Sequence, residues 1–277
     1  MLDRSTIDPG RATNFFSTLG GVPFHHSTSE FDRANAAWLA EFSRLIYRRS
    51  GGEKGSHRGR TRAAFLAKQG LTEKDFFTDG RTQAALIEGP HFQVIVFRGT
   101  EPTRLHEDFI INASFKLVLW NGPGRVHMGF RDAFESMWLQ ISGKPSSRLP
   151  LFITGHSLGG ALASLATIRA AAAKLPVVAT YTFGAPRAGD DTLVAALAST
   201  PLYRVVNDRD FAAHLPPFLL GYRHSNRLAK IDHSGALSFS DDFKDHLDVE
   251  LPQPLEILDH HPANYVALLR KAVPDSA

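Results

Sequence analysis

The sequence predicts an α/β protein with a largely parallel central sheet and flanking helices, and three observations lead to this prediction. From Thr82 onward, short segments rich in β-branched and aromatic residues alternate with helical patterns. The 277-residue chain is 43% hydrophobic, which is enough for one large core. No internal repeat or interdomain linker interrupts it, so a single domain over residues 1–277 is expected. The expected strands cover residues 83–87, 91–97, 149–153, 177–183, 202–206 and 222–231.

Residues 1–64 are expected to form a divergent N-terminal region of helix and loops. A helix is predicted over residues 30–47, where Phe31, Trp38 and Phe42 recur at helical spacing. The segment 48–62 that follows is basic and glycine-laced. We interpret it as a mobile, solvated loop, and the alternative is attraction to an anionic lipid surface or substrate.

Composition excludes several classes of protein. A net charge of +3 on a chain of this size is small, so a dedicated nucleic-acid binder is not expected. The chain has no cysteine, which excludes disulfides, a thiol nucleophile and cysteine-ligated zinc. No run of eighteen apolar residues occurs, so no transmembrane segment is expected and any lipid contact is peripheral.

The first ten residues lack the apolar segment of a signal peptide and carry acidic residues where such a peptide is basic. A cytoplasmic location is therefore the default expectation. Secretion is the alternative if a leader precedes this sequence.

A motif around Ser157 predicts a nucleophile. The residues Gly155-His156-Ser157-Leu158-Gly159 follow an apolar run and open an alanine-rich helical stretch, which is the strand, turn and helix context of a nucleophilic serine. The flanking glycines leave room for the tight turn that exposes the hydroxyl. The helix starting near Leu158 directs its free N–H groups at a developing oxyanion.

A nucleophilic serine of this kind predicts an acid and then a histidine further along the chain. The predicted strand 202–206 runs into a segment that holds Asp208 and Asp210, at the sheet edge where α/β proteins keep their sites. The pair His260 and His261 precedes a last predicted helix. Chain order alone leaves two acids and two histidines as candidates.

In its order of motifs the chain resembles the class 3 lipases, which have the α/β-hydrolase fold. The resemblance covers about residue 65 to the end. It is carried by V-I-V-F-R-G-T at 94–100, V-H-M-G-F at 126–130, the motif around Ser157, T-F-G-A-P-R-A-G at 182–189, residues 203–217 and G-Y-R-H at 221–224.

The resemblance implies a role for individual residues. Ser157 matches the family nucleophile, and Asp210 matches the acid because it stands four residues before H-L-P-P. His260 matches the general base, since an aromatic residue follows it five positions later. Thr100 matches the oxyanion-hole residue that acts beside the N–H of Leu158. The implied reaction needs no cofactor and no metal ion.

The family places a lid between the oxyanion residue and the V-H-M-G-F segment, which here means residues 101–125. This segment is rich in large apolar residues, and we expect Phe109, Ile110 and Ile111 to cover the acyl groove in water and to move at a lipid surface. The family's D-I-V-P is replaced by Asp210-Phe211-Ala212-Ala213. Substrate preference is therefore not inherited from the family.

The expected function is hydrolysis of carboxylic esters through a Ser-His-Asp triad and an acyl-enzyme, with triacylglycerols as the favoured substrate. A feruloyl esterase or a phospholipase would use the same residues with a different pocket. Two alternatives from other classes stay open: a non-catalytic lipid-binding or protein-binding module, and an anion-binding protein built around residues 48–62. The expected partners are an ester or lipid substrate and a lipid–water interface, and the oligomeric state is left open.

Overall fold

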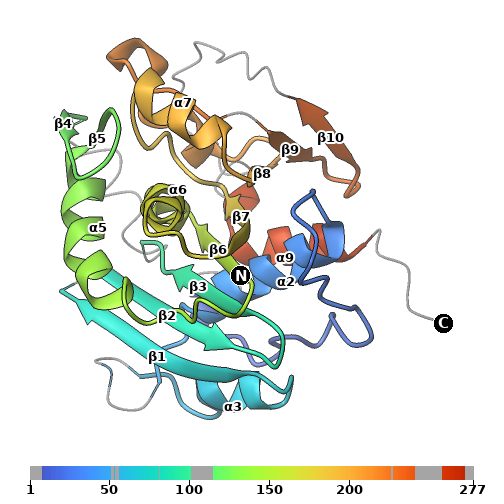
Figure 1. Cartoon of the computed structure of the whole chain (residues 1–277). Coiled ribbons are helices and arrows are strands. Elements are labelled where there is room, and N and C mark those ends of the chain that lie inside the picture. Colours follow the sequence, from blue (N-terminus) through green and yellow to red (C-terminus); the bar gives the residue numbers. More distant parts are fainter. Residues whose placement is uncertain are drawn as a thin grey trace.

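The computed structural model describes residues 8–50, 53, 56–80, 82–100, 115–225, 227–240 and 258–271. In these residues the chain forms an eight-stranded sheet in the order β1-β2-β3-β6-β7-β8-β9-β10 (Figure 1). The strands are β1 (Thr72–Asp79), β2 (Thr82–Glu88), β3 (Gln93–Phe97), β6 (Leu151–His156), β7 (Val177–Phe183), β8 (Leu202–Asn207), β9 (Leu228–Ile231) and β10 (Leu237–Ser240). Strands β3 to β9 pair in parallel, whereas β1, β2 and β10 are joined in antiparallel fashion. The predicted largely parallel sheet is confirmed.

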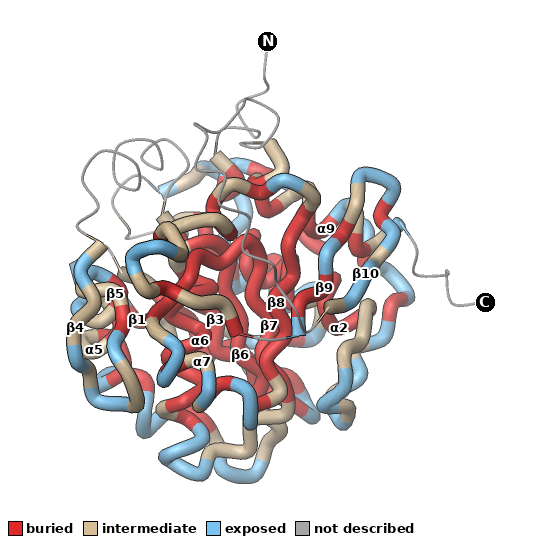
Figure 2. Tube along the Cα trace, turned by 90° about the horizontal axis from the view of Figure 1, so that it is seen from above, coloured by how far each residue is buried: buried red, intermediate tan, exposed pale blue. Residues whose placement is uncertain are grey.

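The central strands are buried on both faces, as Figure 2 shows for β3, β6, β7 and β8. Side chains alternate between two apolar cores along each strand. In β3, Val94 and Val96 face one core while Ile95 and Phe97 face the other. Burial on both faces explains why these strands are continuous apolar runs in the sequence.

Helices cover both faces of the sheet (Figure 1). One face packs against α2 (Arg33–Leu45) and α9 (Pro262–Arg270), and the other packs against α5 (Met128–Ile141), α6 (Leu158–Ala172) and α7 (Asp191–Ala198). A short helix, α3 (Arg62–Ala67), lies next to β1. None of the helices in the described ranges is both long and apolar enough to span a bilayer.

The structure changes some of the predicted elements. The helix predicted over 30–47 is α2, which begins after Asp32, whose side chain accepts a hydrogen bond from the N–H of Asn35 at 2.8 Å. The strand predicted over 222–231 is wrong in its first half. Only Leu228–Ile231 forms β9, because the positive φ of 62° at Arg227 is incompatible with a strand that continues through this residue.

The C-terminal part of the expected lid segment is an ordered hairpin. Strands β4 (Leu117–Leu119) and β5 (Arg125–His127) pair in antiparallel fashion around the turn at residues 121–124. The remaining residues 101–114, including Phe109, Ile110 and Ile111, lie outside the described residues.

The interpretation of segment 48–62 as a mobile, solvated loop is wrong for its described ends. Arg48 and Arg62 are only 1% and 3% exposed. Arg48 donates to the backbone carbonyls of Gly10, Ala12, Arg58 and Arg60, which ties the segment to the N-terminal residues. Arg62 forms ion pairs with Glu53 at 2.6 Å and with Glu73 at 2.7 Å. The two guanidinium groups therefore act as internal cross-links rather than as solvated charges.

Candidate active site

Ser157 stands in a strained turn between β6, which ends at His156, and α6, which begins at Leu158. Its backbone has φ 58° and ψ −132°, a conformation that a residue with a side chain rarely adopts. The turn is held by the N–H of Ser157, which donates to the carbonyl of Phe183 at 2.9 Å. Such a turn projects the serine hydroxyl from the sheet edge, as the sequence predicted.

The glycines on either side make this turn possible. A Cβ atom on Gly155 would collide with the backbone carbonyl of Gly159, and a Cβ on Gly159 would collide with the carbonyl of Phe97. Backbone atoms cannot yield as a flexible side chain can. Both positions therefore require glycine if α6 is to start this close to β3 and β6.

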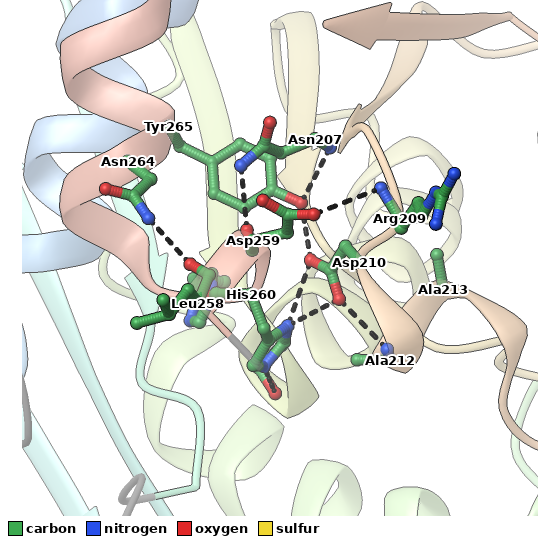
Figure 3. Close-up of polar contacts among 12 residues, drawn as sticks. Asn207, Arg209, Asp210, Ala212, Ala213, Leu258, Asp259, His260, Asn264 and Tyr265 are labelled. Carbon is green, nitrogen blue, oxygen red and sulfur yellow. Dashed lines mark hydrogen bonds and ion pairs between the residues drawn. The ribbon is translucent and has the colours of Figure 1, made fainter. Parts of the chain in front are cut away.

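Three side chains that are far apart in the sequence meet at the carboxyl edge of the parallel strands. The hydroxyl of Ser157 donates to Nε2 of His260 at 2.9 Å. Nδ1 of His260 donates to Asp210, with distances of 2.8 Å to Oδ1 and 3.0 Å to Oδ2 (Figure 3). Ser157 and Asp210 have no exposed surface and His260 is 2% exposed. A serine, a base that can accept its proton and a carboxylate that orients the base are the components of nucleophilic catalysis.

The surroundings of Asp210 hold its carboxylate in one orientation (Figure 3). Oδ1 accepts a hydrogen bond from the N–H of Ala212 at 2.9 Å, and Oδ2 accepts one from the hydroxyl of Tyr265 at 2.5 Å. Burial raises the pKa of Tyr265 well above its ordinary value, and the charge of Asp210 raises it further. The phenol therefore stays protonated and remains a donor to the carboxylate.

His156, the residue before the serine, fixes the backbone of His260. Its Nε2 donates to the carbonyl of His260 at 2.6 Å, and its Nδ1 accepts a hydrogen bond from the hydroxyl of Tyr47 at 3.0 Å. Burial lowers the pKa of His156 well below its ordinary value, so the ring is neutral. Sequence reasoning gave neither His156 nor Tyr47 a role. His156 could have been noticed, because it is a histidine at the end of an otherwise apolar strand. The predicted helix around Tyr47 gives no such signal.

The structure separates the close alternatives. Nδ1 of His260 donates to Asp210 and not to Asp208, which lies two residues earlier and has a positive φ of 37°. His261 caps α9, since its Nδ1 accepts a hydrogen bond from the N–H of Ala263 at 3.2 Å. Geometry therefore favours Asp210 and His260 over their neighbours.

The backbone near Ser157 offers hydrogen-bond donors for an oxyanion. Leu158 is the first residue of α6, so its N–H has no acceptor within the helix and stands at the positive end of the helix dipole. Residue 99 lies against the serine, because a Cβ on Gly99 would come within 3.1 Å of the Cβ of Ser157. Thr100 is the next residue, so the two predicted oxyanion residues belong to segments that adjoin the nucleophile.

In the described ranges, no group of three or more His, Asp or Glu side chains is arranged to hold a metal ion. The residues that meet around Ser157 are donors and acceptors of protons. This arrangement can transfer an acyl group from an ester to the serine hydroxyl.

Known proteins similar to this chain include lipases. Residues 94–220 match the model of the family described as lipase (class 3). The lipase of Rhizomucor miehei is 32% identical over 145 residues, which are 47% of this chain and 39% of that protein. The matched region thus spans about two fifths of the length of this curated relative.

Solved structures extend the similarity beyond the matched region. The structure of Rhizomucor miehei triacylglyceride lipase is similar with a TM-score of 0.56 and 27% identity, over 71% of this chain and 81% of that chain. Lip2 lipase of Yarrowia lipolytica has the same fold, with a TM-score of 0.64 and 19% identity over 84% and 94% of the two chains. The central sheet, the turn at Ser157 and these similarities identify the α/β-hydrolase fold, and residues 94–220 of the chain match the class 3 lipase family.

Proposed function

We propose that this protein hydrolyses carboxylic esters of lipids, with triacylglycerols as the substrate class. The observation that carries the proposal is the continuous hydrogen-bonded chain from the hydroxyl of Ser157 through His260 to Asp210. Similarity to fungal lipases supports the choice of substrate class.

In the first step His260 removes the proton from Ser157, and the Oγ atom attacks the ester carbonyl. The N–H groups of Thr100 and Leu158, together with the Thr100 hydroxyl, stabilise the oxyanion. Asp210 keeps Nδ1 of His260 protonated and stabilises the imidazolium that forms. His260 then gives its proton to the departing alcohol.

In the second step water replaces the alcohol as the nucleophile. Nε2 of His260 removes a proton from the water, the resulting hydroxide attacks the acyl group on Ser157, and the serine recovers its proton as the fatty acid leaves. Tyr265 and Ala212 hold Asp210 in place through both steps, since they keep its two oxygens hydrogen-bonded.

Access to Ser157 requires a conformational change, because the side chain has no exposed surface in this structure. A covered nucleophile suits an enzyme whose substrate is met at a lipid surface rather than in water. The role of Phe109, Ile110 and Ile111 as the cover of the acyl groove stays a prediction, and their replacement with serine would test it.

Replacement of the serine tests the chemistry. Ser157→Ala is expected to lower ester hydrolysis by about a thousandfold or more and to abolish labelling by a fluorophosphonate probe, with the melting temperature near that of the wild type. Ser164→Ala is the matched control, because it removes a buried hydroxyl that bonds only within α6, to the carbonyl of Gly160. Activity of Ser157→Ala within tenfold of the wild type would falsify the proposal.

Substrate class needs its own measurement, because a feruloyl esterase or phospholipase would share the same triad. Initial rates on emulsified tributyrin and triolein, on phosphatidylcholine vesicles and on methyl ferulate separate the three. We expect the highest rates on the triacylglycerols. A preference for methyl ferulate or phosphatidylcholine would move the enzyme to the corresponding class, while the absence of any hydrolysis would favour a non-catalytic lipid-binding module.

A further inference from the structure

Two histidines that are far apart in the sequence lie side by side at the surface. The ring centroids of His26 and His91 are 5.4 Å apart, and the ring planes are tilted by 33°. His26 belongs to the N-terminal region before α2, and His91 belongs to the turn between β2 and β3. His91 is exposed and His26 is half-buried, so small solutes can reach the pair from water.

The nitrogens of these two rings are available to a ligand. Neither His26 nor His91 forms a hydrogen bond or ion pair with another side chain or with the backbone in the described part of the chain. The neighbouring His25 differs, because its Nδ1 lies 2.8 Å from Oδ2 of Asp32. Paired imidazoles without hydrogen-bond partners are a donor set for a metal ion, since a neutral ring nitrogen is the commonest protein ligand of such ions.

The spacing of the two rings fits imidazoles that share one ion. A bond from zinc to an imidazole nitrogen is about 2.0–2.1 Å long, so a tetrahedral ion that binds one nitrogen of each ring holds the ring centres about 5 Å apart. The observed 5.4 Å between the centroids of His26 and His91 is close to this value. The backbone therefore already holds the rings at the spacing that a shared ion requires.

The segments that carry the two rings are fixed. The N–H of His25 donates to Oδ1 of Asn35 at 2.7 Å, and its carbonyl accepts from Nδ2 of Asn35 at 2.9 Å. In the turn, the N–H of Gly89 donates to the carbonyl of Phe92 at 2.9 Å. The rings of Phe24 and Phe92, with centroids 4.3 Å apart, join the two segments directly. Ligands held on packed segments lose little conformational freedom when an ion binds.

The pair lies at the opposite edge of the sheet from the triad. His91 comes just before β3, at the amino ends of the parallel strands, whereas Ser157 follows the carboxyl end of β6. An ion bound by the pair is therefore remote from Ser157 and takes no part in ester hydrolysis.

We propose that His26 and His91 bind one divalent transition-metal ion, of the zinc, nickel or copper class, with water completing its coordination. Imidazole nitrogen suits these ions, whereas magnesium and calcium take oxygen ligands. The ion joins the N-terminal region to the turn between β2 and β3. It stabilises the folded chain, because the unfolded chain does not hold the two rings together. Two protein ligands are fewer than a closed structural zinc site has, so the ion exchanges with solution.

Metal-dependent stability tests the proposal. The protein is dialysed against a chelator, and its melting temperature is measured with the chloride of zinc, nickel, magnesium or calcium. Calorimetric titration with zinc chloride gives the affinity. Zinc at ten times its dissociation constant is expected to raise the melting temperature by about 3–6 °C. Nickel should act as zinc does, whereas magnesium and calcium should leave the melting temperature unchanged.

Replacement of the two ligands separates this site from the other histidines. His26→Asn and His91→Asn are each expected to weaken zinc binding by about tenfold or more, and the double variant should lose no more than either single one, because one ion needs both rings. All three should keep the wild-type melting temperature without metal. His25→Asn is the matched control, since it removes the adjacent imidazole, which pairs with Asp32. Its zinc affinity should equal that of the wild type.

The contrary results are equally clear. If zinc does not raise the melting temperature of the wild type, or raises that of the double variant equally, the two rings are only packed against each other and the proposal is wrong. Equal stabilisation by calcium would overturn it too, because calcium would report an oxygen site. So would a loss of zinc affinity in His25→Asn as large as in His26→Asn.

Discussion

The hydroxyl of Tyr265 on α9 donates to Oδ2 of Asp210 after β8 at 2.5 Å, and it accepts the N–H of Asn207 at 3.1 Å (Figure 3). One phenol therefore joins the last helix to the end of a central strand. The same helix begins two residues after His260, so this contact sets the distance between the candidate base and the candidate acid.

Tyr265→Phe removes this hydroxyl and keeps the ring. A hydrogen bond to a charged group contributes about 1.5–3 kcal/mol, so we expect kcat on a monomeric ester to fall about tenfold or more while KM changes little. Tyr203→Phe is the matched control, because the hydroxyl of Tyr203 bonds to the carbonyl of Ser29, away from the site. An unchanged kcat in Tyr265→Phe would show that Ala212 and His260 alone are enough to orient Asp210.

The identities of the acid and the base can be tested against their neighbours. Asp210→Asn and His260→Ala are expected to lower kcat by about a thousandfold or more, because each removes a member of the triad. Asp208→Asn and His261→Asn should stay within a few-fold of the wild type, since neither side chain bonds to Ser157 or His260 in the structure. If a neighbour is the more damaging member of its pair, the assignment is wrong by that residue.

The motif around Ser157 could be predicted from the sequence because everything it needs is local: an apolar strand, two glycines and a helix. Edge strands could not be predicted in the same way. In β1 four residues are charged and only Phe76 and Phe77 are apolar, since much of this strand faces solvent, so the run Thr72–Asp79 does not look like a buried strand. β10 is also an edge strand, because it pairs only with β9 and its Phe239 is exposed, and the sequence does not predict it.

Supporting contacts of the site depend on tertiary packing and leave little trace in the sequence. Tyr47 reaches His156 across 109 residues only because α2 packs on β6. The sequence predicts solvated charges at Arg48 and Arg62, whereas both guanidinium groups are buried because carbonyls and carboxylates from distant parts of the chain surround them. No local sequence pattern indicates such distant partners. Residues in motifs can therefore be predicted from the sequence, whereas the residues that support them through tertiary contacts cannot.

Acid should destabilise the fold partly through His261. Burial lowers the pKa of His261 to about 4, with the charges of His260 and Arg44 acting in the same direction. In the unfolded chain this histidine binds its proton near pH 6.5. The contribution of neutral His261 to the free energy of unfolding is therefore fully present above that pH and is lost as the pH falls from 6.5 toward 4. The loss due to this one group is at most about 3 kcal/mol.

His261→Asn should reduce that loss, because asparagine can still cap α9 but does not titrate. Urea unfolding at pH 7 and at pH 4.5 measures the difference. We expect the free energy of unfolding to fall less in the variant than in the wild type, while the exposed His233→Asn behaves as the wild type does. Equal losses in the wild type and His261→Asn would assign the acid sensitivity to other buried groups, such as His156 and His224, whose pKa values burial also lowers.

Gly99→Ala should disable the site through the backbone rather than through a functional group. A Cβ at this position would collide with the hydroxyl of Tyr47 and with the carbonyl of His156, and the carbonyl cannot yield because it ends strand β6. Residues 99 and 100 must then move away from Ser157, which removes the Thr100 donors from the oxyanion. Loss of one oxyanion donor costs about 100- to 1000-fold in kcat, so we expect a loss of that size on p-nitrophenyl butyrate. Gly143→Ala is the control, because nothing lies within 4 Å of a Cβ there. A Gly99→Ala rate within threefold of the wild type would mean that the Thr100 segment does not serve the oxyanion.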